Sequence, residues 1–309
     1  MKNINISRKK YFQIQKLILP NDVMSTEADL LTFEYCGKIK VFKSFKNHTS
    51  NGAKFANKLY TVQMLDTYKE ILPNSFVIPD SLCSVSGNIE GFTLPYIEGV
   101  NMEHYLNDKK ISPKEKLYFI KRIGLILEQM DHIRQNTNLK SLFINDLHAS
   151  NFIIQKDKGE VKIVDLDSCK ICDNKSFPAR YLGSLGLFNA APYNKYILEQ
   201  KDSEKKYDHN NYEDYYGYVC ANANSDLYCY TILFLNFLYG SNINLFSINE
   251  FYDYMYYLGK IGIDKNLVNA LYKIVSSGNN ENIYAYLDLL TEEQVYRADK
   301  KVYKTVKKI

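Results

Sequence analysis

The stretch at residues 151–165 constrains the fold of this chain more than any other. It reads Asn-Phe-Ile-Ile-Gln-Lys-Asp-Lys-Gly-Glu-Val-Lys-Ile-Val-Asp, so two short apolar runs flank a polar turn centred near Lys158. Such a pattern is typical of a β-hairpin. Antiparallel pairing about that midpoint predicts that Asn151 lies opposite Asp165 at the open end. Asp146 precedes Asn151 by five residues, so a short loop can fold it back beside them.

Two carboxylates and an amide oxygen are therefore expected to converge at the mouth of the hairpin. Oxygen ligands of this kind suit a magnesium ion that holds phosphates. The alternative is three polar strand ends that face water, and for Asn151 or Asp165 alone that alternative is favoured. The prediction of a metal site depends on the residues meeting.

Lys43 is the one charge on an otherwise apolar strand face. In residues 38–45 a period of two separates two faces: Ile39, Val41, Lys43 and Phe45 on one, and Lys38, Lys40, Phe42 and Ser44 on the other. Because an unpaired buried ammonium is costly, Lys43 is expected to face an anion, and a phosphate would serve. A lysine that snorkels at a sheet edge is the alternative.

The N-terminal third is dominated by strand patterns. Residues 1–30 indicate an irregular start with an apolar patch at 17–19, and residues 30–45 indicate a strand, a turn at Gly37 and a second strand. A helix is predicted over 53–72, closed by Pro73. Short extended runs follow at 76–79 and 91–97.

Helix patterns dominate the rest of the chain. Ser112 and Glu115 form a capping box around Pro113, which starts a long amphipathic helix. Ser225 is expected to cap a helix that is apolar nearly all round and is therefore buried, and this helix ends at Gly240. Further helices are predicted at 248–258, at 264–276 and from there to the end, whereas residues 173–224 indicate long loops.

Strands followed by helices indicate an α+β fold, with a boundary near residues 97–99. The hydrophobic content of 46%, the charged content of 24% and the net charge of +4 are ordinary for a globular protein and do not suggest a nucleic-acid partner. The N-terminus has no apolar stretch of signal-peptide length, and the most apolar run, at 231–239, is shorter than the ~20 residues of a membrane helix. A soluble, cytoplasmic protein without a membrane partner is expected.

Taken together, these motifs resemble protein-kinase-like folds. The spacing of Asp146, Asn151 and Asp165 is similar to a catalytic loop followed by a metal-binding aspartate, and Lys43 resembles the third-strand lysine of a Val-Ala-x-Lys motif. Three further matches are the hinge-like run Thr-Leu-Pro-Tyr-Ile-Glu-Gly from Thr93, the Ser-Asp-Leu-Tyr run from Ser225, and Ala191-Pro192 near the end of an activation segment. The resemblance covers nearly the whole chain.

This resemblance implies a bilobal fold, with a small antiparallel-sheet lobe that covers the nucleotide at 1–97 and a larger helical lobe at 98–309. It implies that ATP and Mg²⁺ are bound, that Asn151 and Asp165 ligate the metal, and that Lys43 holds the phosphates. Asp146 would accept the proton of the attacking hydroxyl. His148 is included in the predicted catalytic set, at a position where protein kinases usually have lysine.

The resemblance also assigns a hinge and a structural support. Pro95 would offer its carbonyl to adenine and Ile97 its N–H, with Val41 and Leu94 also in the nucleotide-binding set. A proline is compatible there because only a carbonyl is required. Asp226 would cap the backbone amides of the catalytic loop, which is a structural role.

Several features depart from the protein-kinase pattern. The stretch at 21–38 has one glycine, Gly37, so no Gly-rich phosphate loop precedes Lys43. Asn145 stands where an arginine is usual, Asp165-Leu-Asp167 replaces Asp-Phe-Gly, and the helix after Lys43 lacks an obvious glutamate partner.

Three functions follow from this pattern. The preferred hypothesis is a protein Ser/Thr kinase-like phosphotransferase that uses ATP and magnesium and acts on an unidentified hydroxyl acceptor. The second is a weak or inactive pseudokinase that binds a nucleotide or a partner. The third is a small-molecule kinase, because Asp-Leu-His at 146–148 resembles phosphotransferases related to aminoglycoside kinases.

Overall fold

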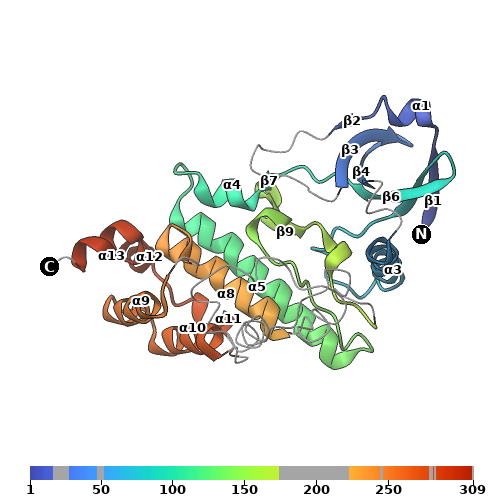
Figure 1. The fold of residues 1–309 in the computed structure, drawn as a ribbon. Coiled ribbons are helices and arrows are strands. Elements are labelled where there is room, and N and C mark those ends of the chain that lie inside the picture. The colour runs from blue at the N-terminus through green and yellow to red at the C-terminus, as the bar shows by residue number, and fades with distance from the viewer. Residues whose placement is uncertain are drawn as a thin grey trace, which may run out of the picture.

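The computed structural model describes residues 1–16, 28–46, 52–173, 223–243, 246–277, 281 and 283–307 (Figure 1). The chain is a mixed α+β protein, as predicted, with most of its strands in the first third and most of its helices after them. The predicted loops at 173–224 lie almost wholly outside the described residues, and so does the apolar patch at 17–19.

The strands described in the N-terminal part form a six-stranded sheet in the order β1-β5-β6-β4-β3-β2. Only the β1–β5 pair is parallel. The strand bounds are Lys2–Ile6 for β1, Gln15–Lys16 for β2, Ala28–Tyr35 for β3, Lys38–Phe45 for β4, Ser81–Val85 for β5 and Asn88–Pro95 for β6. Helix α3 (Ala53–Thr67) lies beside this sheet, and the short helix α1 is Arg8–Tyr11 (Figure 1).

The predicted strand–turn–strand pattern at 30–45 is confirmed by the β3–β4 hairpin. Its two turn residues, Cys36 and Gly37, both have positive φ angles, of 51° and 72°. Two left-handed residues give a turn whose twist matches that of the flanking strands. The alternation along β4 is also confirmed, because Phe45 packs with α3 residues while Phe42 packs in a separate apolar cluster.

Three N-terminal expectations were wrong. The start of the chain is not irregular, since β1 pairs in parallel with β5 and buries Ile4 and Ile6. Helix α3 ends at Thr67 rather than near residue 72. The run at 76–79 forms only an isolated bridge between Phe76 and Ile163. In the first and third cases the local structure depends on a contact distant in sequence.

A second sheet lies at the start of the helical part. It has the order β7-β8-β9, from strands Val100–Asn101, Phe152–Gln155 and Glu160–Ile163. The β8–β9 pair is the predicted hairpin. The remaining helices are α4 (Met102–Asn107), α5 (Pro113–Asn136), α8 (Ala223–Tyr239), α9 (Ile248–Lys260), α10 (Lys265–Ser277), α11 (Tyr284–Leu287), α12 (Glu292–Ala298) and α13 (Lys300–Val306). No described helix is both long enough and apolar enough to cross a membrane.

The long helix α5 begins at the predicted Pro113, but only half of the predicted capping box forms. The Ser112 hydroxyl accepts a hydrogen bond from the Glu115 N–H at 3.2 Å, and Pro113 occupies the first turn. The Glu115 carboxylate instead accepts from Tyr105 at 2.6 Å and pairs with Lys156 at 2.8 Å. Helix α5 is thus tied to both α4 and the β8–β9 turn, which holds the hairpin against the helices.

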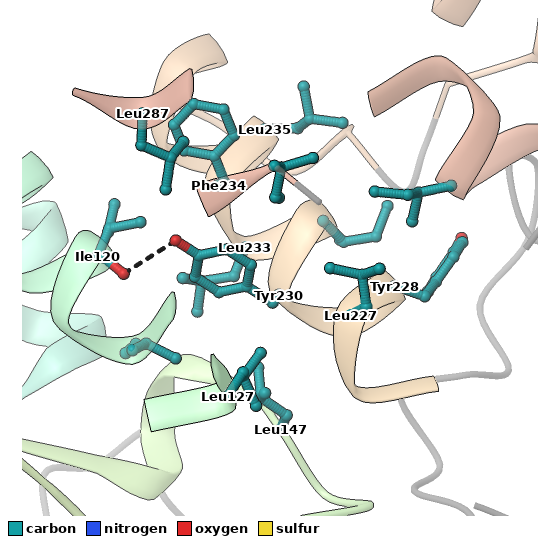
Figure 2. Packing of buried hydrophobic residues seen from close by; sticks show 14 of the residues in the cluster. Ile120, Leu127, Leu147, Leu227, Tyr228, Tyr230, Leu233, Phe234, Leu235 and Leu287 are labelled. Atoms are coloured by element: carbon teal, nitrogen blue, oxygen red, sulfur yellow. Dashed lines mark hydrogen bonds between the residues drawn. The ribbon is translucent and has the colours of Figure 1, made fainter. Parts of the chain in front are cut away.

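The main core forms where α8 packs against α5. Figure 2 shows Tyr230 of α8 reaching α5, where its hydroxyl donates to the Ile120 carbonyl at 3.1 Å. Leu65, Leu72 and Phe76 belong to the same large cluster. The segment that follows α3 therefore packs on the helical part, although it precedes the predicted boundary at 97–99.

Gly124 of α5 provides a test of this packing. A Cβ there would lie 2.8 Å from both the Tyr230 hydroxyl and Tyr284 Cδ1, whereas a Cβ at Gly259 of α9 would meet nothing within 4 Å. Gly124→Ala should therefore destabilise the protein by about 1–3 kcal/mol through overpacking. Gly259→Ala should stabilise it by up to about 1 kcal/mol through helix propensity. Urea unfolding of both variants measures this, and equal shifts would contradict the α5–α8 packing.

Candidate functional site

Lys43 is buried beside two aromatic rings of the sheet, those of Phe45 and Phe92. The residue is only 7% exposed, and its Nζ lies 5.5 Å and 6.0 Å from the ring centres of Phe45 and Phe92. It pairs with Asp165 and, at 2.8 Å, with Asp167. The expected anion opposite Lys43 is thus present, as two carboxylates more than 120 residues away in sequence.

The register of the β8–β9 hairpin differs from the predicted one by one residue. Phe152 pairs with Ile163, and Val164 donates to the Asn151 carbonyl at 2.9 Å, so Asn151 lies opposite Val164 rather than Asp165. The prediction assumed an odd-length turn, whereas the turn contains four residues and ends at Gly159 in the left-handed region. The backbone of Asp165 adopts a left-handed conformation, with φ 62° and ψ 43°. The chain therefore bends there, out of the strand.

Two charged residues of the site were not predicted. One Asp167 carboxylate oxygen lies 2.8 Å from Lys43 and the other lies 2.9 Å from Lys58 of α3. Lys58 also donates to the Ser168 hydroxyl at 3.1 Å. A signal for Lys58 was present in the sequence, since it falls with Phe55, Val62 and Leu65 on the buried side of α3. The acidic residue Asp66 of α3 pairs with the N-terminal ammonium of Met1 at 2.6 Å and with Lys69 at 3.8 Å, rather than with Lys43.

The carboxyl groups of Asp165 and Asp167 differ in their protonation equilibria. Burial alone would raise the pKa of Asp167, yet Lys43 and Lys58 hold it well below its ordinary range. Removal from water raises the pKa of Asp165, against the pull of Lys43 and with the help of the Asp167 charge. Burial alone would lower the pKa of Lys43, but the two carboxylates raise it. Lys43 is therefore charged, and Asp167 is its firmly ionised partner.

Asp146, His148 and Asn151 meet in the loop before β8. The Asn151 amide nitrogen donates to the Asp146 carboxylate at 3.2 Å and to the Asp146 carbonyl at 3.0 Å. His148 Nε2 lies 3.6 Å from the other Asp146 oxygen. The predicted neighbourhood of Asp146 and Asn151 is confirmed. Among the described residues no group of three or more His, Cys, Asp or Glu is arranged to hold a metal ion. Magnesium ligation by Asn151 and Asp165 stays a prediction.

Asp226 supports this loop as expected. Its two oxygens accept from the N–H groups of Ile144 and Asn145 at 2.7 and 2.8 Å. Asn145 has a left-handed backbone, with φ 65°, and its side chain donates to the Ser168 carbonyl at 3.0 Å. Burial raises the pKa of Asp226 to about 6, although the two amides pull it down. The loop and the Asp165–Asp167 segment are thereby fixed to each other and to α8.

The predicted hinge residues lie along β6 and just beyond it. Leu94 is buried opposite Val41, and Pro95 is exposed opposite Lys40 at the strand end. Ile97 and Val164 pack against the apolar cluster that contains Phe92. Apolar side chains therefore adjoin the charged site. The adenine contacts assigned to Pro95 and Ile97 stay predictions.

A separate cavity of about 450 Å³ lies between α5 and α8 and contains none of the predicted site residues. Three of its charged lining groups already have partners: Arg134 pairs with Asp131 and donates to the Leu142 carbonyl, and Asp226 holds the loop. The predicted site residues lie outside this cavity.

A scan against models of protein families finds none that matches this chain, and a search of curated proteins finds no significant match. The residues and their geometry are thus the basis for assigning a function.

Asp226→Ala should be far more damaging than the loss of an ordinary helix cap. It strands two buried N–H groups, so a loss of about 2–4 kcal/mol in unfolding free energy is expected. The matched control is Asp264→Ala, which removes the acceptor of the Asn266 and Leu267 N–H groups at the accessible start of α10. That change should cost about 1 kcal/mol. Equal losses in urea unfolding would show that Asp226 acts only as a surface cap.

Proposed function

We propose that this chain is an ATP- and magnesium-dependent phosphotransferase with a bilobal protein-kinase-like fold. The observation that carries the proposal is the buried Lys43 of β4, which meets Asp165 directly after the β8–β9 hairpin. The loop with Asp146 and Asn151 flanks the same hairpin end. A mostly antiparallel sheet with helix α3 beside it, followed by this hairpin and a helical part, supports the fold assignment.

The donor set fits Mg-ATP by its chemistry. Mg-ATP would supply a transferable phosphoryl group whose negative charge the metal partly neutralises. Lys43 provides a fixed cation for phosphate, and the oxygens of Asp165 and Asn151 are hard ligands of the kind magnesium prefers. Asp146, held by the Asn151 amide, would accept the proton of the attacking hydroxyl group. The apolar side chains of Ile97 and Val164 are suited to a purine ring.

A non-catalytic nucleotide- or partner-binding role is the second candidate. It is favoured by the direct ion pair between Lys43 and Asp165, because these are the groups that would hold phosphate and metal. Under the first candidate this pair opens when the ligand binds, and under the second it persists.

Mg-ATP should raise the melting temperature of the protein. A ligand that binds only the folded state stabilises it by RT ln(1 + [L]/Kd), about 2.7 kcal/mol at a hundredfold excess over Kd. The control is ATP with a chelator, which should give a smaller shift. Identical melting curves with and without Mg-ATP would contradict nucleotide binding altogether.

The two aspartates should separate binding from turnover. Asp165→Asn removes a charge from the cation site, so it should abolish the magnesium-dependent part of ATP binding in calorimetric titration. Asp146→Asn should leave ATP affinity nearly unchanged and lower turnover by ~10²-fold or more, as expected for a lost general base. Turnover is followed with labelled ATP and peptide or small hydroxyl acceptors. If the first variant binds Mg-ATP normally and the second does not, the roles are reversed.

A further inference from the structure

The Asp167 carboxylate is shared between two lysines that come from different elements. Its side chain is wholly enclosed, with 0% exposed. One oxygen faces Lys43 on β4 at 2.8 Å, and the other faces Lys58 on α3 at 2.9 Å. Asp167 itself lies in the helical turn Leu166–Ser168 (η3). A single carboxylate thus joins the sheet, its helix and the segment after the hairpin.

Asp165 and Asp167 are not equivalent partners of Lys43. The side chain of Asp165 is 39% exposed, so part of this carboxylate faces solvent and can turn toward a cation, although its oxygen beside Lys43 is desolvated. Asp167 cannot leave without removing a carboxylate from both of the buried lysines that it contacts. Removing one member of a buried ion pair is strongly destabilising because it leaves an uncompensated charge. Asp165 is therefore the mobile partner of Lys43, and Asp167 is the fixed one.

The charges in this cluster balance, with Lys43 and Lys58 against Asp165 and Asp167. In protein kinases a glutamate on the equivalent helix pairs with the strand lysine. Here helix α3 carries a lysine, and the carboxylate comes from the segment after the hairpin. The strand, the helix and the segment after the hairpin are still linked, but the helix carries the positive charge and the segment carries the negative charge.

We propose that Asp167 is a positioning residue that fixes the Lys43 ammonium in the site and couples helix α3 to it through Lys58. That Lys43 contacts phosphate rests on the function proposed above. That Asp167 anchors Lys43 and Lys58 does not depend on that function. When Asp165 turns to a metal ion, Lys43 keeps Asp167 as its partner. A displacement of α3 pulls on Lys58 and so on Asp167, which makes the position of this helix a determinant of nucleotide affinity.

The anchoring is tested without nucleotide by amine labelling, with mass spectrometry reporting each lysine. Asp167→Asn should raise the labelling rates of both Lys43 and Lys58 by roughly tenfold or more, the effect of losing about 1.4 kcal/mol of protection. Asp165→Asn, the matched control, should leave the Lys58 rate unchanged. Lys40, which pairs with Asp80 elsewhere on the sheet, is the internal reference. Parental rates at Lys43 and Lys58 in Asp167→Asn would overturn the proposal.

The coupling to the site is tested by titration with Mg-ATP below the melting temperature. Asp167→Asn should weaken binding by roughly tenfold or more, and adding Lys58→Glu, which returns a carboxylate beside Lys43, should restore part of it. If Asp167→Asn does not fold, the double variant with Lys58→Met is used in its place. It removes one charge of each sign, and the same loss of affinity is expected. A purely structural tie predicts lower melting temperatures with unchanged affinity, and this result would overturn the positioning role.

The two proposals fail in different ways. If the parent protein does not bind Mg-ATP, the proposed function fails, and the labelling experiment still decides whether Asp167 anchors the lysines. If the parent binds Mg-ATP and Asp167→Asn binds it equally well, the positioning role fails and the proposed function stands.

Discussion

The rest of the structure depends on the pairing of four charges beneath the sheet. Lys43, Lys58 and Asp167 are all less than 9% exposed, so each would be costly without a partner. They come from a strand, a helix and a turn far apart in the sequence. Their mutual pairing therefore fixes how the sheet, α3 and the segment after the hairpin sit against one another. Apolar packing alone would allow small slides between these elements, whereas a buried ion pair requires defined positions.

Backbone strain accompanies this pairing at two points. Asn145 and Asp165 both adopt left-handed conformations, which asparagine and aspartate tolerate better than most residues. Asp226 holds the first through two backbone amides, and the end of the β8–β9 hairpin precedes the second. Such outliers persist only where the surroundings impose them, and they gather at functional sites. Here the Asn145 side chain donates to the Ser168 carbonyl, and the Asp165 side chain pairs with Lys43.

What the sequence predicted correctly was encoded locally. The hairpin, the start of α5 and the burial of Lys43 all follow from period and capping within a few residues. The β1–β5 pairing could not be predicted this way, because parallel partners lie about eighty residues apart. The hairpin register was wrong by one residue because a turn of four residues was not distinguishable from one of five. The role of Asp167 could not be predicted, because its partner Lys58 lies 109 residues earlier in the sequence.

The presence of four charged side chains in this largely buried cluster is itself an argument about function. Replacing a buried ion pair by well-packed apolar residues is often neutral or stabilising, so stability alone does not explain the cluster. The neighbouring Phe45 and Phe92 show that apolar side chains are accommodated there. Of the four charges, only Asp165 is substantially exposed, and it adjoins the loop of Asp146 and Asn151. The cluster thus combines a buried cation with one carboxylate that reaches solvent. A purely structural tie between sheet and helix does not require that asymmetry, whereas a site that admits an anionic ligand with its cation does.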